Sequence, residues 1–180
     1  HAKLIMAGGS SAIQAAVEEA LKEGDSVGGL IECIAGNIPI GWGEPFFDSV
    51  ESSISHLIFA IPAVKGIEFG SGFAAASMKG SLHNDPIIDA SGKTATNNAG
   101  GISGGLTNGN DLIFRVAIKP TSSISIPQHS YSLETGRQET IQVKGRHDAC
   151  IALRAPVVVE AVTAIALADL KLRFQTQKKI

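Results

Sequence analysis

The stretch Asp-Leu-Ile-Phe-Arg-Val-Ala-Ile-Lys at residues 111–119 decides the fold. Apolar residues occupy every second position in it, namely Leu112, Phe114, Val116 and Ile118. Because successive side chains of a strand point to opposite faces, one face of this segment is fully apolar, which predicts a strand against a core. Asn108-Gly109 just before it has the composition of a hairpin turn, so we expect this strand to pair with the preceding glycine-rich stretch.

Further strands are predicted on both sides of this segment. Strand-like runs stand at residues 27–35, 38–42, 63–69, 124–133 and 138–143. A turn signal separates the first two runs and another separates the last two, so each of these pairs predicts a hairpin. Residues 70–93 show no clear period, and no element is predicted there.

Three segments have the apolar spacing of helices. The first covers residues 11–21 and stops at Gly24, and the second covers 49–61, where Pro62 ends the pattern. The third covers 156–172 and is apolar on all sides, which predicts burial between two layers. Together the elements predict one α+β domain over residues 1–180, with antiparallel strands packed on helices.

Composition excludes several classes of function. The net charge of −2 gives no general attraction to nucleic acid or acidic lipid, and no apolar run approaches the ~20 residues that cross a bilayer. The two cysteines, Cys33 and Cys150, lie far apart and outside any CxxC pair. They argue against a zinc site and a disulfide-rich scaffold, and favour a reducing, cytoplasmic setting.

Three segments carry residues suited to chemistry. Residues 97–105 contain four glycines that allow close approach to a ligand, although a structural turn explains them as well. Lys119–Ser123 offers a cation and three hydroxyls that suit a phosphate, with a polar turn as the alternative. Arg146-His147-Asp148 combines an anion ligand with proton carriers, and a surface charge cluster is the alternative.

Taken in order with residues 43–45, 63–68 and 154–161, these segments resemble the C-terminal half of the chorismate synthase family, from Ser26 to Leu170. The sequence departs from the family at Ala149, where proline is usual, and within residues 104–109. The resemblance implies a β-α-β sandwich, of which this chain supplies one antiparallel sheet and its helices. It further implies a 1,4-elimination of phosphate from 5-enolpyruvylshikimate-3-phosphate, giving chorismate for aromatic amino acid biosynthesis, with reduced FMN as cofactor.

The resemblance also assigns roles to residues of this chain. It places Asp148 near N5 of the flavin, where the carboxyl group would assist proton transfer. It implies flavin contacts at Pro62, Ala63, Gly104, Lys119, Pro120, Thr121, Ser122 and Ser123. For Arg146 it implies a contact to the flavin or to the substrate. It implies no metal, and it implies a cytoplasmic homotetramer. Whether an NADPH-dependent flavin reductase activity accompanies the lyase activity is left open.

Two signatures of the family, Gly-Glu-Ser-His-Gly and an arginine-rich Ser-Ala-Arg segment, do not occur in this sequence. They supply the family's catalytic histidines and most of its substrate-binding arginines. We therefore expect a partial enzyme that is inactive by itself. One alternative is a non-enzymatic module that binds flavin or phosphate, or that serves oligomerisation. Another is a generic nucleotide-binding domain, but the sequence lacks the GxGxxG and Walker patterns of such domains.

Overall fold

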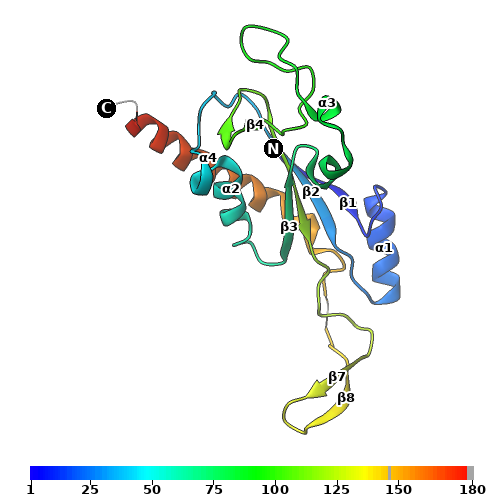
Figure 1. The fold of residues 1–180 in the computed structure, drawn as a ribbon. Helices are drawn as coiled ribbons and strands as arrows, with labels where there is room; N and C mark the ends of the chain where they lie inside the picture. The colour runs from blue at the N-terminus through cyan, green and yellow to red at the C-terminus, as the bar shows by residue number, and fades with distance from the viewer. Residues whose placement is uncertain (146, 178–180) are drawn as a thin grey trace.

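The computed structural model describes residues 1–145 and 147–177. Its centre is a four-stranded antiparallel sheet in the order β1-β2-β6-β3, with α2 and α4 on one face (Figure 1). The strands are β1 (Ala2–Ala7), β2 (Gly29–Ala35), β6 (Leu112–Ile118) and β3 (Val64–Phe69). The strand predicted at residues 111–119 is confirmed, and so is the α+β class with an antiparallel sheet.

The predicted alternation places one face of β6 in the core. Its four apolar side chains Leu112, Phe114, Val116 and Ile118 are all buried, and the ring of Phe114 lies 5.6 Å from that of Phe69 on β3. The residues between them point to the opposite face, which we call the open face. Because β6 pairs with both β2 and β3, its apolar side holds the sheet and the helices together.

The three predicted helices are present as α1 (Ile13–Glu23), α2 (Val50–Ile58) and α4 (Pro156–Gln177). Gly24 ends α1 in the left-handed conformation, as predicted. Ser49 caps α2 by accepting a hydrogen bond from the Ser52 amide at 3.1 Å. None of the helices in the described part of the chain is long and apolar enough to span a bilayer.

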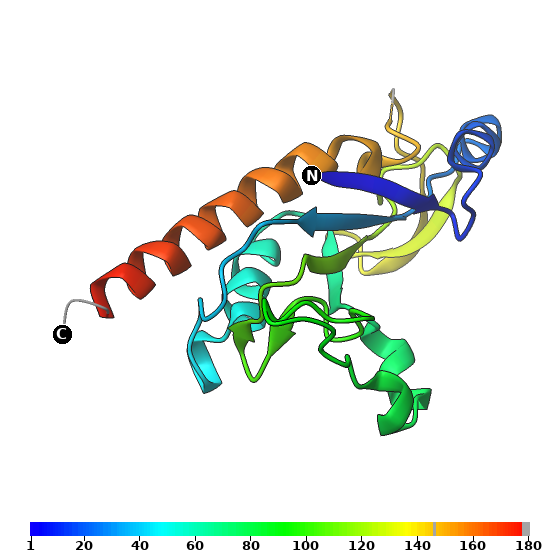
Figure 2. The same ribbon diagram turned by 90° about the horizontal axis from the view of Figure 1, so that it is seen from above.

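The expected burial of the C-terminal helix on all sides is wrong for this chain. One side of α4 is buried, through Val159, Thr163, Ala166 and Leu170. On the other side Val157 is 66% exposed and Leu172 is 61% exposed, because no second layer among the described residues covers them (Figure 2). The described residues therefore supply one four-stranded sheet and a helix layer that is packed on one side only.

Two predicted hairpins are wrong. Residues 38–42 form no strand, because the buried Thr107 binds this segment instead: its hydroxyl donates to Pro39 O at 2.6 Å and accepts from Trp42 N at 2.9 Å. The glycine-rich stretch forms no strand ladder with β6, although Gly100 O accepts a hydrogen bond from the Ile113 amide at 3.1 Å. It forms its own small ribbon, β4 (Ile102–Ser103) with β5 (Leu106–Thr107).

The remaining elements lie around the sheet. The predicted distal hairpin is confirmed as β7 (Gln128–Ser132) and β8 (Arg137–Ile141), which project from the body of the molecule (Figure 1). Strand β1 had no sequence prediction, and it completes the sheet at the edge beside β2. Short helices occur at η1 (Phe46–Asp48), η2 (Gly72–Ser77), α3 (Gly80–His83) and η3 (Ile151–Arg154).

Truncation of Phe114 tests the central role of β6. We expect Phe114→Ala to lower the free energy of unfolding by about 3–5 kcal/mol, since the fully buried ring leaves a cavity. Phe47→Ala, at a ring that is almost fully exposed, is the matched control and should change it by less than about 0.5 kcal/mol. Urea unfolding of both variants measures the difference, and equal losses would contradict the assignment.

Candidate functional site

Segments that are far apart in the sequence meet at the end of β6 that carries Lys119. The Lys119 amide donates to Ala63 O at 2.9 Å. The Ser26 hydroxyl donates to Thr121 O at 2.6 Å, and the Val27 amide donates to Ala149 O at 2.8 Å. Ser26–Val27 therefore connects the Lys119–Ser123 turn to the segment that contains Asp148, and three of the predicted motifs share one end of the sheet.

Close backbone contacts determine the path of this turn. A Cβ atom on Gly28 would lie 2.6 Å from Ile118 O and 3.2 Å from Pro120 Cδ, so only glycine lets the chain pass here. Ala63 has a φ of 71°, which is uncommon for a residue with a side chain. Its carbonyl is thereby presented to the Lys119 amide.

Two polar atoms near this turn are buried without a hydrogen-bond partner among the described residues. They are the Thr121 hydroxyl oxygen and His147 Nε2. Leaving such a group unsatisfied costs about 1–3 kcal/mol, so each atom is suited to a polar ligand. Both residues belong to motifs singled out from the sequence, and hydroxyl and imidazole groups suit a flavin or a phosphate.

Asp148 pairs with an arginine that had no predicted contact with it. Arg154 Nη2 on η3 donates to Asp148 Oδ1 at 2.7 Å, and 42% of the Asp148 side chain remains exposed. An exposed ion pair of this kind contributes little to stability, but it fixes the direction of the carboxylate. Only the short sequence separation of six residues could have indicated the pair. Arg146 lies outside the described residues.

Gly104 lies at the opposite end of the sheet. It follows β4, and the carbonyl of its neighbour Gly105 accepts a hydrogen bond from the Val50 amide at the start of α2. Since β6 separates the two ends and a strand rises ~3.3 Å per residue, roughly 20 Å lie between Gly104 and the Lys119 turn. Within one chain, the structure does not bring Gly104 to the other predicted residues.

The glycine-rich stretch has a structural role at Gly100 and Gly101. A Cβ on Gly100 would lie 2.5 Å from Gly70 N, and one on Gly101 would lie 2.5 Å from Asp111 O. The Asp85 carboxylate fastens this stretch by accepting from the amides of Asn98 and Ala99. Burial raises the pKa of Asp85, but the hydrogen bonds outweigh it and leave the pKa below its usual range.

Two hollows deserve comparison with the predicted site. A cavity of about 180 Å³ contains Ser122 and runs along the apolar side of the β7–β8 hairpin, where Ile141 and Val143 line it. A second hollow, about 680 Å³, lies between α2 and α4 beside Leu57 and Ile165, on the uncovered helix layer. Among the described residues no group of His, Cys, Asp and Glu is arranged for a metal ion.

Replacing Thr121 by valine tests the unpartnered hydroxyl. We expect Thr121→Val to leave the free energy of unfolding unchanged, or to raise it by about 1 kcal/mol, because it removes an unsatisfied buried group. Thr163→Val is the matched control. Its hydroxyl donates to Val159 O at 2.6 Å, so that variant should lose about 1 kcal/mol. Urea unfolding without ligand measures both, and an equal loss would mean that the Thr121 hydroxyl has a protein partner.

Comparison with known proteins places these features in a family. The model of the chorismate synthase family matches residues 3–172. A chorismate synthase of Chitinophaga pinensis is 62% identical over 164 residues, which cover 91% of this chain and 49% of the relative. One from Dehalococcoides mccartyi is 51% identical over 166 residues, covering 91% and 46%.

A solved structure agrees with the sequence matches. A crystal structure of chorismate synthase superimposes with a TM-score of 0.71 at 32% identity, covering 90% of this chain and 42% of the other. The chain thus spans about half the length of the curated relatives that it matches. From the family match, the identities and the shared fold, this chain belongs to the chorismate synthase family.

Proposed function

We propose that this chain supplies part of the flavin and substrate site of a chorismate synthase. The parent activity is the 1,4-elimination of phosphate from 5-enolpyruvylshikimate-3-phosphate, and the cofactor is reduced FMN. The observation that carries the proposal is the meeting of Ala63, Lys119–Ser123 and Asp148 at one end of the sheet, beside two buried polar atoms without partners. Thr121 Oγ1 and His147 Nε2 can form hydrogen bonds with a flavin, and for this reason the residues present fit this cofactor.

The turn at the end of β6 provides charge and hydrogen bonds for anions. The substrate carries a phosphate and two carboxylates, and FMN carries a further phosphate. The Lys119 ammonium group offsets part of this charge, while the hydroxyls of residues 121–123 donate short hydrogen bonds. Bound there, reduced FMN supplies the electron density that assists cleavage of the carbon–oxygen bond to phosphate.

Asp148 is positioned to move a proton at this site. The elimination removes a proton from the substrate as phosphate leaves, so a carboxyl group within reach of solvent and ligand is useful. Arg154 holds one oxygen of Asp148 at 2.7 Å, and among the described residues the other oxygen has no hydrogen-bond partner that would compete with a ligand. Arg154 therefore acts as a positioning residue, and its guanidinium group adds positive charge beside the anionic ligands.

The proposal also covers the cellular compartment and the oligomeric state of the enzyme. We place it in the cytoplasm, in agreement with two separate buried cysteines. The homotetramer is carried over from the chorismate synthase family. A second candidate function is a flavin- or phosphate-binding module without catalysis. The missing family signatures and the single helix layer, which is open on one side, favour it for the isolated chain.

Assaying the isolated chain for chorismate formation distinguishes the two candidate functions. We expect no chorismate from the 180-residue chain with substrate and reduced FMN under anaerobic conditions, because the substrate's charges are left under-neutralised. A chimera in which this chain replaces the matching 164 residues of the Chitinophaga pinensis relative should form chorismate. Turnover by the isolated chain would contradict the need for a second half, and an inactive but folded, FMN-binding chimera would favour the binding module.

Asp148→Asn in the same chimera tests the proton-transfer role. The amide keeps the size of the carboxyl group but cannot titrate, so kcat should fall by roughly 10²–10⁴-fold while the FMN dissociation constant changes little. Asp89→Asn, on an exposed loop away from the Lys119 end, is the matched control and should leave kcat unchanged. Anaerobic chorismate formation and FMN titration give the two readouts. Unchanged turnover, or loss of folding, would make Asp148 a structural residue.

A further inference from the structure

A short segment between α1 and β2 holds the base of the projecting hairpin. The chain leaves the sheet after β6, forms β7 and β8 and returns before η3, and we call residues 119–149 the arm (Figure 1). We call residues 24–28 the clamp, because they form hydrogen bonds with both ends of the arm. On the returning side the Val27 amide donates to Ala149 O at 2.8 Å. The clamp thereby holds the chain directly after Asp148.

The clamp holds the outgoing side of the arm at two points. The Ser26 hydroxyl donates to Thr121 O at 2.6 Å, and Gly24 O accepts a hydrogen bond from the Ser125 amide at 2.9 Å. A Cβ atom on Gly24 would lie 3.3 Å from the Ser125 side chain, so the two segments approach each other closely. The hydroxyl-rich turn of the proposed flavin site lies between these two bonds and the end of β6.

The end of α1 gives the clamp a fixed position. The Asp25 amide donates to Ala20 O at 2.9 Å, and the Gly24 amide donates to Leu21 O at 3.2 Å. With Gly24 in the left-handed conformation, these bonds satisfy the last carbonyl groups of the helix. The Asp25 carboxylate then accepts a hydrogen bond from the Ser26 amide at 2.7 Å. Ser26 is therefore held by a closed helix end, from which its side chain reaches the arm.

Ser26 bonds to the main chain of the residue whose hydroxyl lacks a partner. Thr121 Oγ1 is buried and has no hydrogen-bond partner among the described residues. Because the directions open to a side chain depend on the main-chain conformation, the bond to Thr121 O also limits where this hydroxyl can point. A serine hydroxyl has one proton to donate, and the Thr121 carbonyl takes it. Ser26 thus acts on a ligand through Thr121.

We propose that Ser26 is a positioning residue of the flavin site, whose hydroxyl holds the Thr121 carbonyl so that the Thr121 hydroxyl stays directed at a polar atom of the bound flavin. This inference rests on the proposed function, since it takes the flavin as the ligand of the turn. The Val27 amide holds the chain after Asp148 from the same clamp. One helix end therefore positions both the binding turn and the segment of the proton carrier.

Removing the Ser26 hydroxyl in the chimera separates positioning from a merely structural link. The FMN dissociation constant should rise about three- to tenfold in Ser26→Ala, the change expected for one lost hydrogen bond. Thr163→Val is the matched control, because its hydroxyl also donates to a carbonyl at 2.6 Å, within α4, and should leave FMN binding unchanged. Ser26→Thr keeps the hydroxyl and should restore binding, since a hollow of about 120 Å³ beside residue 26 has room for the methyl group. Equal dissociation constants in Ser26→Ala and the control would overturn the proposal.

A double-mutant cycle tests whether Ser26 acts through Thr121. Thr121→Val removes the hydroxyl that is proposed to contact the flavin, so nothing is left for Ser26 to direct. Adding Ser26→Ala to Thr121→Val should therefore change the FMN dissociation constant little further. If the two substitutions instead multiply their separate effects, Ser26 acts independently of Thr121, and the proposal is wrong. FMN titration of the two single variants and the double variant of the chimera gives the three values needed.

Amide hydrogen exchange of the 180-residue chain tests the link without any flavin. Ser26→Ala should speed exchange of the Ser125 amide, because one of the two bonds that hold the outgoing side is lost. If this variant does not fold, Ser26→Cys keeps a similar shape with a weaker donor and should give the same changes. An unaltered chimera that binds no FMN would contradict the proposed function, while the exchange rates would still report whether Ser26 holds the turn. Unchanged exchange of the Ser125 amide would overturn the positioning role.

Discussion

The burial of one face of β6 is the interaction on which the rest of the structure depends. Its four alternating apolar residues reach from one end of the sheet to the other, and α2 and α4 pack against them. Because β6 is bonded to β2 and β3 on its two sides, it also sets the register of both neighbours. A slip of one residue would turn Arg115 into the core and Phe114 to the open face, so the register has no close competitor.

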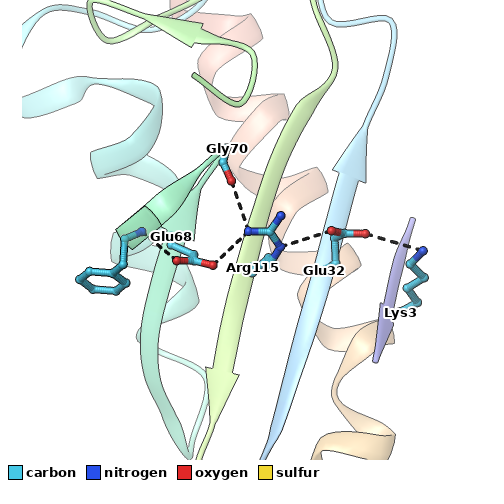
Figure 3. A network of polar contacts seen from close by, with 6 residues as sticks. Lys3, Glu32, Glu68, Gly70 and Arg115 are labelled. Carbon is cyan, nitrogen blue, oxygen red and sulfur yellow. Dashed lines mark hydrogen bonds and ion pairs between the residues drawn. The ribbon is translucent and has the colours of Figure 1, made fainter. Parts of the chain in front are cut away.

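The same strand determines where chemistry can occur. At the C-terminal end of β6, the Lys119 amide donates a hydrogen bond to the carbonyl of Ala63. The turn that follows is held by the Ser26 hydroxyl. The strand thus places a hydroxyl-rich turn beside the segment of Asp148, so that a regular element positions the binding groups. The polar side of β6 has another consequence, since Arg115 forms ion pairs with Glu32 on β2 and Glu68 on β3 across the open face (Figure 3). Glu32 in turn pairs with Lys3 on β1.

The helix layer explains how a chain of this length relates to its family. Leu172 and Val157 on α4 stay exposed although their spacing is that of a buried helix, and the large hollow beside Ile165 lies on the same side. Apolar surface of this extent is normally covered. It agrees with a chain that spans about half the length of its relatives.

Local pattern was enough for the elements whose burial follows a simple period. The alternation in residues 111–119, the helices before Gly24 and Pro62, and the distal hairpin could all be predicted. The roles of the motifs at Lys119 and Asp148 stay predictions. Pattern could not find the Thr107 contacts that replace a predicted hairpin, the Arg154 contact to Asp148, or the separation of Gly104 from the Lys119 turn. The sequence by itself thus determined which segments form strands and helices, because side-chain period and turn residues act over a few positions. Only the tertiary structure decided which segments meet, because long-range hydrogen bonds and ion pairs depend on strand order and register that no local pattern encodes.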